Sequence, residues 1–496
     1  TTEVGNVLNQ ANVTLLPIEQ DKIMNANAAQ IKTNVYNKHN DEILVIGAGI
    51  SGLVSAFFLQ QQGFRVTLLE AATRVGGNIQ SFKQHGALVE RGPNSWINNR
   101  PAMARLVDEL DLHGECVVAN PLAKRRYIVQ NGHLVALPDS IGSAVSNPIL
   151  NPLAKLRVLV EPLFGRAVHE ETIAEFVTRR LGSQCLDWLV DPFVSGVYAG
   201  DPGQLSVRAA VPKVYALEAD YGSLLRGGMR LQWARRKIRS AALTGAMMSF
   251  RQGLQQLPES LNRRLGRVVH TDVQADSIGY TEATGWQVRS GERSWQAARL
   301  ILAVPAHQIA RLISGLHDVE SGSISQVQAS LRAIQYPAVA SISMAFKRHQ
   351  IAHPLDGFGA LIPSREQRHT LGILFPSSVF DHRVAAGQCL LTGFIGGARN
   401  SAIMLWDTNR RQQQVLDDLT DLLDISGSPL WIEESFWPQA IPQYTLGHLQ
   451  RVAQVDAGLA TYPGLYLCSN WRDGVALGDC IENAWQLVQR VMDEYD

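Results

Sequence analysis

Three glycines and one acid near the start of the chain have the types and spacing of a dinucleotide-binding site. Gly47, Gly49 and Gly52 form a Gly-x-Gly-x-x-Gly turn, and Glu70 follows eighteen residues after the last of them. In such a turn the first glycine permits a tight bend, the second lets the backbone approach a pyrophosphate, and the third allows a helix to pack closely on a strand. The N–H groups at the helix start, which includes Ser51, attract phosphate, and Glu70 is placed to accept hydrogen bonds from both hydroxyls of an unphosphorylated ribose.

The elements that must hold this turn follow from the surrounding pattern. Residues 43–46 are a short apolar, β-branched run that is typical of a buried parallel strand. Residues 53–62 show a helical pattern that ends at Gly63, and residues 65–69 predict a second strand, which Glu70 closes. Because strand, turn, helix, strand and acid stand in register, the pattern indicates dinucleotide binding and not an isolated glycine-rich turn.

The residues that follow Glu70 indicate which dinucleotide binds. Arg74, Gly76 and Gly77 resemble the second flavin signature of glutathione-reductase-like FAD enzymes, in which an arginine and a glycine pair follow the ribose-binding acid. The resemblance implies that a basic side chain and bare backbone meet the second phosphate and the ribitol of an extended FAD. Simple NAD dehydrogenases lack this signature, so the expected cofactor is FAD.

The C-terminal segment is expected to complete the FAD domain. Residues 464–468 predict a strand, and a loop containing Val475 and Gly478 leads from it into a helix over residues 481–495. Flavoproteins of this group close the isoalloxazine site in this way, with the helix N-terminus aimed at the N1–C2 region of the flavin.

Two segments in the middle of the chain are expected to add strands to the same sheet. Residues 267–273 predict an edge strand whose backbone reads the adenine, and Val273 is the expected contact. Residues 300–305 predict another strand. The FAD domain is therefore expected to be discontinuous along the chain.

The composition of the whole chain disfavours several classes of protein. Its 496 residues predict roughly two to four domains, and 46% hydrophobic residues are enough for large cores. Lys+Arg and Asp+Glu are equal at 45 each, which disfavours a nucleic-acid binder that neutralises phosphates. The five cysteines are scattered, with no Cys-x-x-Cys pair, so we expect a reducing compartment, no disulfide scaffold and no metal site. No run is long and apolar enough to span a bilayer.

The first forty residues differ in composition from the rest. They contain eight Asn and neither Ser nor Arg. Transit peptides are rich in Arg and Ser, and secretory signals join a positive start to an apolar block, so the segment fits neither pattern. We expect residues 1–40 to be a flexible arm, with a short helix around residues 13–29 as the alternative, and we expect the protein not to be secreted.

Several motifs further along the chain carry a family resemblance. The segment from Asp191 to Pro202, followed by Leu205 and Ser206, closely resembles a signature of the oxygen-dependent protoporphyrinogen oxidases, especially of their plastid-like branch. Other matching stretches occur in the family's order, namely residues 90–95, 249–254, 371–375, 393–397, 437–443 and 474–478. The likeness extends from about residue 41 to the C-terminus, so it is much more specific than the dinucleotide turn alone.

The resemblance implies an α/β fold in which a doubly wound, glutathione-reductase-like FAD domain carries an inserted mixed-sheet substrate domain and a helical membrane-associating domain. The expected boundaries are 1–40 for the arm, 41–95, 246–309 and 436–496 for the FAD domain, 96–245 for the helical domain, and 310–435 for the substrate domain. Helical patterns occur at 102–112, 154–163 and 173–181. The resemblance also implies a peripheral membrane protein that faces a reducing compartment, either a bacterial cytoplasm or a plastid-type membrane, with a homodimer as a candidate assembly.

The implied reaction is the FAD-dependent, six-electron oxidation of protoporphyrinogen IX to protoporphyrin IX in haem or chlorophyll biosynthesis, with O2 as the acceptor and H2O2 as its product. In the family, a meso carbon gives hydride to flavin N5, while the protein orients the macrocycle and excludes water. The family's propionate-binding arginine matches Arg126. An arginine suits that role, since a guanidinium donates two parallel hydrogen bonds to a carboxylate. Arg125 is the alternative if the register shifts by one. A further alternative is that this basic stretch is a solvated strand edge with no role in binding.

The remaining residues that the resemblance assigns are mostly apolar. The family's hydrophobic clamp matches Leu361, Leu374 and Phe394, each of which could equally be plain core. Gly196 matches a glycine that brings bare backbone toward a pyrrole, and Asn94 matches a polarising group near the flavin and the reacting carbon.

Three alternative functions stay open at this point. The nearest is oxidation of coproporphyrinogen III to coproporphyrin III, a substrate with four propionates in place of two. A flavin amine oxidase or a carotenoid desaturase shares the FAD fold, but an amine oxidase should show paired aromatics facing the flavin and a lysine near its N5, which the motifs here do not suggest. A flavin-containing scaffold or porphyrin carrier without turnover is the non-enzymatic alternative.

Overall fold

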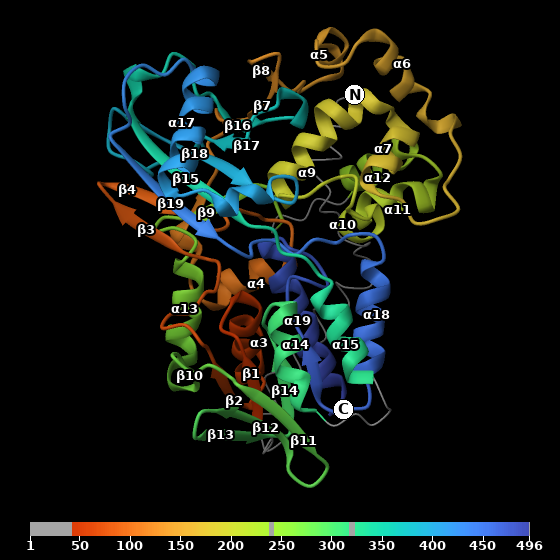
Figure 1. The fold of residues 1–496 in the computed structure, drawn as a ribbon, viewed down its shortest axis with the longest axis vertical. Helices are drawn as coiled ribbons and strands as arrows, with labels where there is room; N and C mark the ends of the chain where they lie inside the picture. Colours follow the sequence, from red (N-terminus) through yellow and green to blue (C-terminus); the bar gives the residue numbers. More distant parts are fainter. Residues whose placement is uncertain (1–41, 238–242, 317–322, 496) are drawn as a thin grey trace.

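The computed structural model describes residues 42–237, 243–316 and 323–495, so the arm expected over residues 1–40 lies outside the described part of the chain. Figure 1 shows a five-stranded sheet with its helices in the lower half, and a seven-stranded sheet beside a cluster of helices in the upper half. The first strand and the last helix that are described both belong to the lower half. The upper half is therefore inserted between them.

The lower sheet is parallel throughout and has the order β10–β2–β1–β14–β20. Its strands are β1 (Glu42–Ile46), β2 (Arg65–Leu69), β10 (Val269–His270), β14 (Arg299–Leu302) and β20 (Leu465–Leu467). Each overlaps a segment that the apolar pattern predicts to be a strand, with β1 and β14 each beginning one residue earlier than predicted, so the strands themselves are confirmed. Parallel neighbours need crossover connections, and here the crossovers include whole inserted segments.

Both faces of this sheet are covered, as a doubly wound fold requires. One face packs against α3 (Ile50–Gln61), α4 (Pro101–Glu109), α13 (Gln256–Leu265) and α19 (Leu477–Asp493). The other face packs against α14 (Ala306–Leu312), α15 (Ser323–Arg332), α18 (His448–Leu459) and the antiparallel sheet of β11 (Ser277–Thr281), β12 (Gly285–Ser290) and β13 (Arg293–Ala297).

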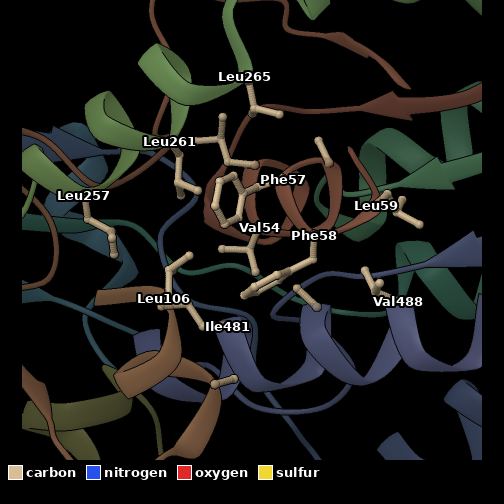
Figure 2. Packing of buried hydrophobic residues seen from close by; sticks show 14 of the residues in the cluster. Val54, Phe57, Phe58, Leu59, Leu106, Leu257, Leu261, Leu265, Ile481 and Val488 are labelled. Carbon is tan, nitrogen blue, oxygen red and sulfur yellow. The ribbon is translucent and has the colours of Figure 1, made fainter. Parts of the chain in front are cut away.

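Helix α3, which follows the glycine turn, is buried on all sides. Its residues 51–59 are all buried, because the helix lies between the sheet and the other helices of this face. Figure 2 shows Phe57 facing Leu261 of α13, and Phe58 lies toward α19, where it meets Trp485 edge-on with ring centroids 4.7 Å apart. This packing fixes the start of α3 against the ends of β1 and β14.

The upper sheet is mixed and has the order β19–β15–β18–β17–β16–β7–β8. Its strands are β7 (Arg125–Gln130), β8 (His133–Ala136), β15 (Val339–Lys347), β16 (Gly357–Leu361), β17 (Thr370–Leu374), β18 (Gln388–Gly396) and β19 (Trp431–Trp437). Only the β7–β16 pair is parallel. Helix α17 (Thr408–Leu423) packs against the core of this sheet.

This sheet corrects the boundaries that the sequence suggests. Strands β7 and β8 lie in it, although residues 96–245 are expected to be helical. Tyr127 and Val129 pack into the core of the sheet, while Ile128 between them packs into the helical core. Burial on both sides removes the apolar–polar alternation by which a strand is recognised. In addition, α4 and α15 pack in the FAD-domain cores, so the expected limits at residues 95 and 309 are also displaced.

The helical part surrounds its own core. Its helices are α5 (Ile141–Ser146), α6 (Pro152–Leu159), α7 (Ile173–Leu181), α8 (Ser183–Cys185), α9 (Asp191–Tyr198), α10 (Val207–Ala210), α11 (Pro212–Tyr221) and α12 (Leu224–Lys237). Short strands complete the fold, namely the β3–β4 hairpin (Ser81–Gln84 and Ala87–Glu90) and the β5–β9–β6 sheet (Trp96–Ile97, Met247–Phe250 and Cys116–Val118). Within the described ranges, no helix combines the length and apolarity needed to cross a membrane.

Candidate active site

A cavity of about 1540 Å3 lies where the parallel sheet, the mixed sheet and the helical part meet. Its wall includes the turn after β1, the loop before α19, strands β16–β18, and helices α9–α11. Small-molecule pockets usually measure about 300–1,000 Å3. The cavity therefore has room for a dinucleotide together with a second large ligand.

The glycine turn forms one end of this cavity. Gly47 has φ of +101°, which only glycine adopts readily, and a Cβ on Gly52 would lie 1.9 Å from the Gly47 carbonyl oxygen. These two glycines bring the first turn of α3 into direct contact with the bend. Gly49 and Ser51 line the cavity, and apart from the adjoining backbone no atom of the described residues lies within 4 Å of the position that a Cβ on Gly49 would take. The open space over Gly49 is where a pyrophosphate can approach the backbone.

Glu70 is held rigidly at the same end. Its Oε2 accepts a hydrogen bond from the Ala48 N–H at 2.6 Å, and its Oε1 accepts one from the Ala72 N–H at 2.8 Å. A carboxylate oxygen has a further lone pair, so both oxygens can still accept bonds from ribose hydroxyls. Val273 is buried beside it and also lines the cavity. The Val273 N–H donates to the Glu70 carbonyl at 2.8 Å, so the main-chain group that Val273 can offer to adenine is its own carbonyl oxygen.

Arg74 contacts the loop that carries the glycine pair. Gly76 and Gly77 line the cavity, but Arg74 and Gly52 do not. The Arg74 guanidinium instead donates to the carbonyls of Gly77 at 2.7 Å and Val75 at 3.2 Å. It also donates to the carbonyl of Ile79 at 3.4 Å and to Gln80 Oε1 at 3.3 Å. Arg74 therefore braces the glycine pair, and its contact with the second phosphate of FAD stays a prediction.

The loop before α19 also lines the cavity. Val475 and Gly478 line it, and α19 begins at Leu477 with no side-chain cap at Ala476. Tyr444 fixes the loop, because its hydroxyl accepts a hydrogen bond from the Gly474 N–H at 3.0 Å and donates one to the Asn470 carbonyl.

Two features of the cavity wall fit a flavin dinucleotide, namely the glycine turn with Glu70 and the start of α19. Helix α3 also lacks a side-chain cap at Gly49, so two helix N-termini present unpaired N–H groups and partial positive charge to the same space. One is placed for a pyrophosphate, and the other is placed for the part of an isoalloxazine ring that becomes negative on reduction.

Arg126 reaches the cavity from β7 and is half-buried there. Burial lowers the pKa of its guanidinium, and the ring of Phe358 lies 5.8 Å from it. Among the described residues no carboxylate pairs with Arg126. Arg125, the alternative, points away from the cavity and pairs with Asp356 at 2.6 Å. The structure therefore offers Arg126, and not Arg125, to a ligand.

The expected clamp residues come together on three neighbouring strands. Leu361 on β16, Leu374 on β17 and Phe394 on β18 all line the cavity. Gly196 on α9 faces them, since a Cβ there would lie 2.4 Å from Leu361 Cδ2. Asn94 lines the cavity in the loop after β4, where its Nδ2 donates to the Gly92 carbonyl at 3.3 Å. The arrangement is an apolar slot with a cation in one wall.

Sequence reasoning did not single out other prominent wall residues. Tyr444 follows the 437–443 motif directly, and Arg208 lies two residues after Ser206, where the longest motif ends. Arg100 lies on the wall and forms an ion pair with Asp479 in the first turn of α19. Their positions beside matched motifs are the only signal in the sequence that could have found the first two.

Fold and site together define a flavoprotein oxidoreductase with a large apolar substrate cavity. Residues 50–492 match the family described as flavin-containing amine oxidoreductase, and the chain belongs to that family. Its cofactor is FAD.

Individual relatives agree with this assignment. Protoporphyrinogen oxidase 1 of Arabidopsis thaliana chloroplasts is 32% identical, over 90% of this chain and 87% of its own. Coproporphyrinogen III oxidase of Bacillus subtilis is 26% identical, over 89% of this chain and 95% of its own. A crystal structure from Exiguobacterium sp. 255-15, provisionally assigned as a protoporphyrinogen oxidase, superposes with a TM-score of 0.77 at 25% identity, over 92% of this chain and 99% of its own.

Proposed function

We propose that this protein oxidises protoporphyrinogen IX to protoporphyrin IX with O2 as the electron acceptor, which yields H2O2. The observation that carries the proposal is Arg126, a half-buried cation without a protein partner among the described residues, in an apolar cavity that continues to the dinucleotide end. Bound FAD supplies the two-electron acceptor, which must be used three times to remove six electrons. The protein's own residues bind and orient the macrocycle and keep water from it.

The slot suits a flat, mostly apolar ring with a carboxylate at one edge. Leu361, Leu374 and Phe394 can contact its faces and apolar substituents, while the backbone at Gly196 approaches closely because a side chain there would collide with Leu361. Arg126 can bind a propionate with two parallel hydrogen bonds. Asn94 is a candidate polar group at the reacting carbon. Aromatisation drives the reaction, so these positioning roles are sufficient without a strong general base.

Both enzymatic alternatives fit the cavity less well. Coproporphyrinogen III would place two more carboxylates against the slot, and transfer of an unpaired carboxylate from water to an apolar wall costs several kcal/mol. An amine substrate carries a positive charge, which the unpaired Arg126 would repel.

The experiment is a two-substrate assay on the FAD-loaded protein. Protoporphyrinogen IX and coproporphyrinogen III are supplied separately, and porphyrin fluorescence and H2O2 are followed together. We expect protoporphyrin to form faster than coproporphyrin, with three H2O2 per porphyrin. If neither porphyrin forms faster than in an enzyme-free solution, the proposal is wrong. A faster reaction of coproporphyrinogen would instead favour the Bacillus-type activity.

We also propose that the helical part rests on a membrane surface through an apolar patch. Leu153, Leu156 and Leu159 lie on one side of α6 by their spacing, and each exposes more than half of its side chain. Leu163 is 79% exposed in the turn that contacts α12, which carries Trp233, 72% exposed. Figure 1 shows α6 at the outer edge of the molecule. Exposed leucines that follow one another along a helix and the next turn are typical of an interaction surface.

Sedimentation with anionic lipid vesicles tests this surface. Leu156→Asp should reduce the bound fraction, since it places a charge in the interface, whereas Leu430→Asp, a similarly exposed leucine beside β19, should not. Equal binding of both variants and of the unmodified protein would contradict the proposal.

A further inference from the structure

Most arginines on the cavity wall are already paired within the protein. Six arginines line the described cavity, and four of them have partners, namely Arg91 with Glu433, Arg100 with Asp479, Arg311 with the Ala275 carbonyl, and Arg472 with Asp456. Arg126 and Arg208 have no carboxylate or carbonyl partner among the described residues. The cavity therefore offers two guanidinium groups, and not one, to a ligand.

Arg208 is presented by a well-fixed element. It lies on α10 between the buried residues Val207 and Ala209, and its own side chain is exposed. The Tyr198 hydroxyl donates to the Ala210 carbonyl at 3.0 Å, and the Ser206 N–H donates to the Tyr444 carbonyl at 2.8 Å. These bonds tie α10 to α9 on one side and to the segment that supports the flavin loop on the other. The backbone that carries Arg208 is thus fixed, while no described residue pairs with its guanidinium.

Arg126 and Arg208 belong to different walls. Arg126 comes from β7 in the mixed sheet, and Arg208 comes from α10, which Figure 1 shows with the helices of the other upper lobe. A ligand that met both would have to carry two negative groups and span the slot between the sheet and the helical part.

We propose that Arg208 is a second carboxylate-binding residue of the substrate site, so that the porphyrinogen is held as a dicarboxylate from two walls. The inference rests on the proposed function and deepens it. Two unpartnered arginines match the two propionates of protoporphyrinogen IX in number and in charge. Arg208 is then a specificity residue, because its positive charge stabilises a bound substrate that carries a second carboxylate and repels a cationic substrate.

The test compares Arg208→Gln with Arg126→Gln and with Arg226→Gln, an arginine on α12 outside the cavity. Glutamine keeps a polar side chain and removes the charge. For protoporphyrinogen IX, Arg208→Gln should raise KM about 10- to 100-fold, the size of a hydrogen bond to a charged group, with little change in kcat. Arg126→Gln should behave alike, and Arg226→Gln should match the unmodified protein. The Kd for FAD, followed by flavin fluorescence, should be the same in all four proteins.

The dimethyl ester of protoporphyrinogen IX shows whether charge is the cause. The ester should raise KM in the unmodified protein, and Arg208→Gln should add little further increase because no second carboxylate remains. An unchanged KM for the free acid, an equal effect of Arg208→Gln on acid and ester, or a weaker FAD affinity would overturn the role of Arg208. Failure of the proposed function would look different, because the unmodified protein itself would then form no porphyrin.

Discussion

Replacing Gly49 with alanine separates the fold of the glycine turn from its role toward the cofactor. Gly49 has φ of −66° and ψ of 176°, which alanine adopts readily, and within the described ranges only the adjoining backbone lies within 4 Å of the added methyl. The free energy of unfolding of the FAD-free protein should therefore change by less than about 0.5 kcal/mol. The methyl would occupy the space that a pyrophosphate needs. Overpacking of this kind costs about 1–3 kcal/mol, which corresponds to a rise of about 5- to 150-fold in the Kd for FAD.

Two measurements and two control variants make this prediction sharp. Thermal unfolding of the FAD-free protein reports stability, and quenching of flavin fluorescence reports Kd. Gly52→Ala should lower both stability and affinity, since its Cβ would lie 1.9 Å from a backbone oxygen, whereas Gly114→Ala, with open space around it and no contact with the cavity, should change neither. If Gly49→Ala bound FAD as well as the unmodified protein does, the pyrophosphate would not lie over this turn.

Two further predictions concern buried charge. Arg180 is fully buried between Glu161 and Glu218, so Arg180→Met should lower the free energy of unfolding by about 3–5 kcal/mol. Arg365→Met, at a side chain that is 58% exposed, should lower it by less than about 1 kcal/mol, and denaturant titration measures both changes. Burial, and to a smaller extent the charge of Arg451, lower the pKa of His448 to about 4. As the pH falls, the unfolded chain therefore binds a proton before the folded protein does, and up to about 3 kcal/mol of the free energy of unfolding is lost between pH 6.5 and 4. His448→Phe keeps the stack on Tyr444 and should flatten this part of a plot of Tm against pH; an unchanged slope would contradict it.

The parts of the fold that sequence predicts well are local. The strand before Gly47, the turn and the following helix depend on neighbours within twenty residues, and the glycines have the geometry that the turn requires. The order of the strands in the parallel sheet is not local, but the matched C-terminal segment indicated that the chain returns to it. The family resemblance supplied the clamp and Arg126.

The error in the boundary of the helical part arises where a strand is buried on both sides. Strand β7 packs against the sheet core on one face and the helical core on the other, so its pattern carries no mark of a strand edge, and the segment was assigned to the helical part. Arg74 has the expected neighbours in sequence, and only the structure shows that its guanidinium donates to carbonyls of its own loop. Neither the two-sided burial of β7 nor the hydrogen bonds of Arg74 can be predicted from residue types alone.

Which arginines are free for a ligand is likewise a property of the folded chain. The partners of Arg91 and Arg100 lie 342 and 379 residues further along the sequence, so only the fold shows that these two charges are already used. The same fold brings Arg126 and Arg208 to one cavity from a strand and a helix that sequence reasoning placed in a single helical segment. Arg126, half-buried and unpaired among the described residues, loses hydration without gaining a protein partner, so an anion that enters the cavity would stabilise it. If both residues bind the substrate as proposed, the feature that they select is the charge of the substrate, and not the cofactor site shared across the family.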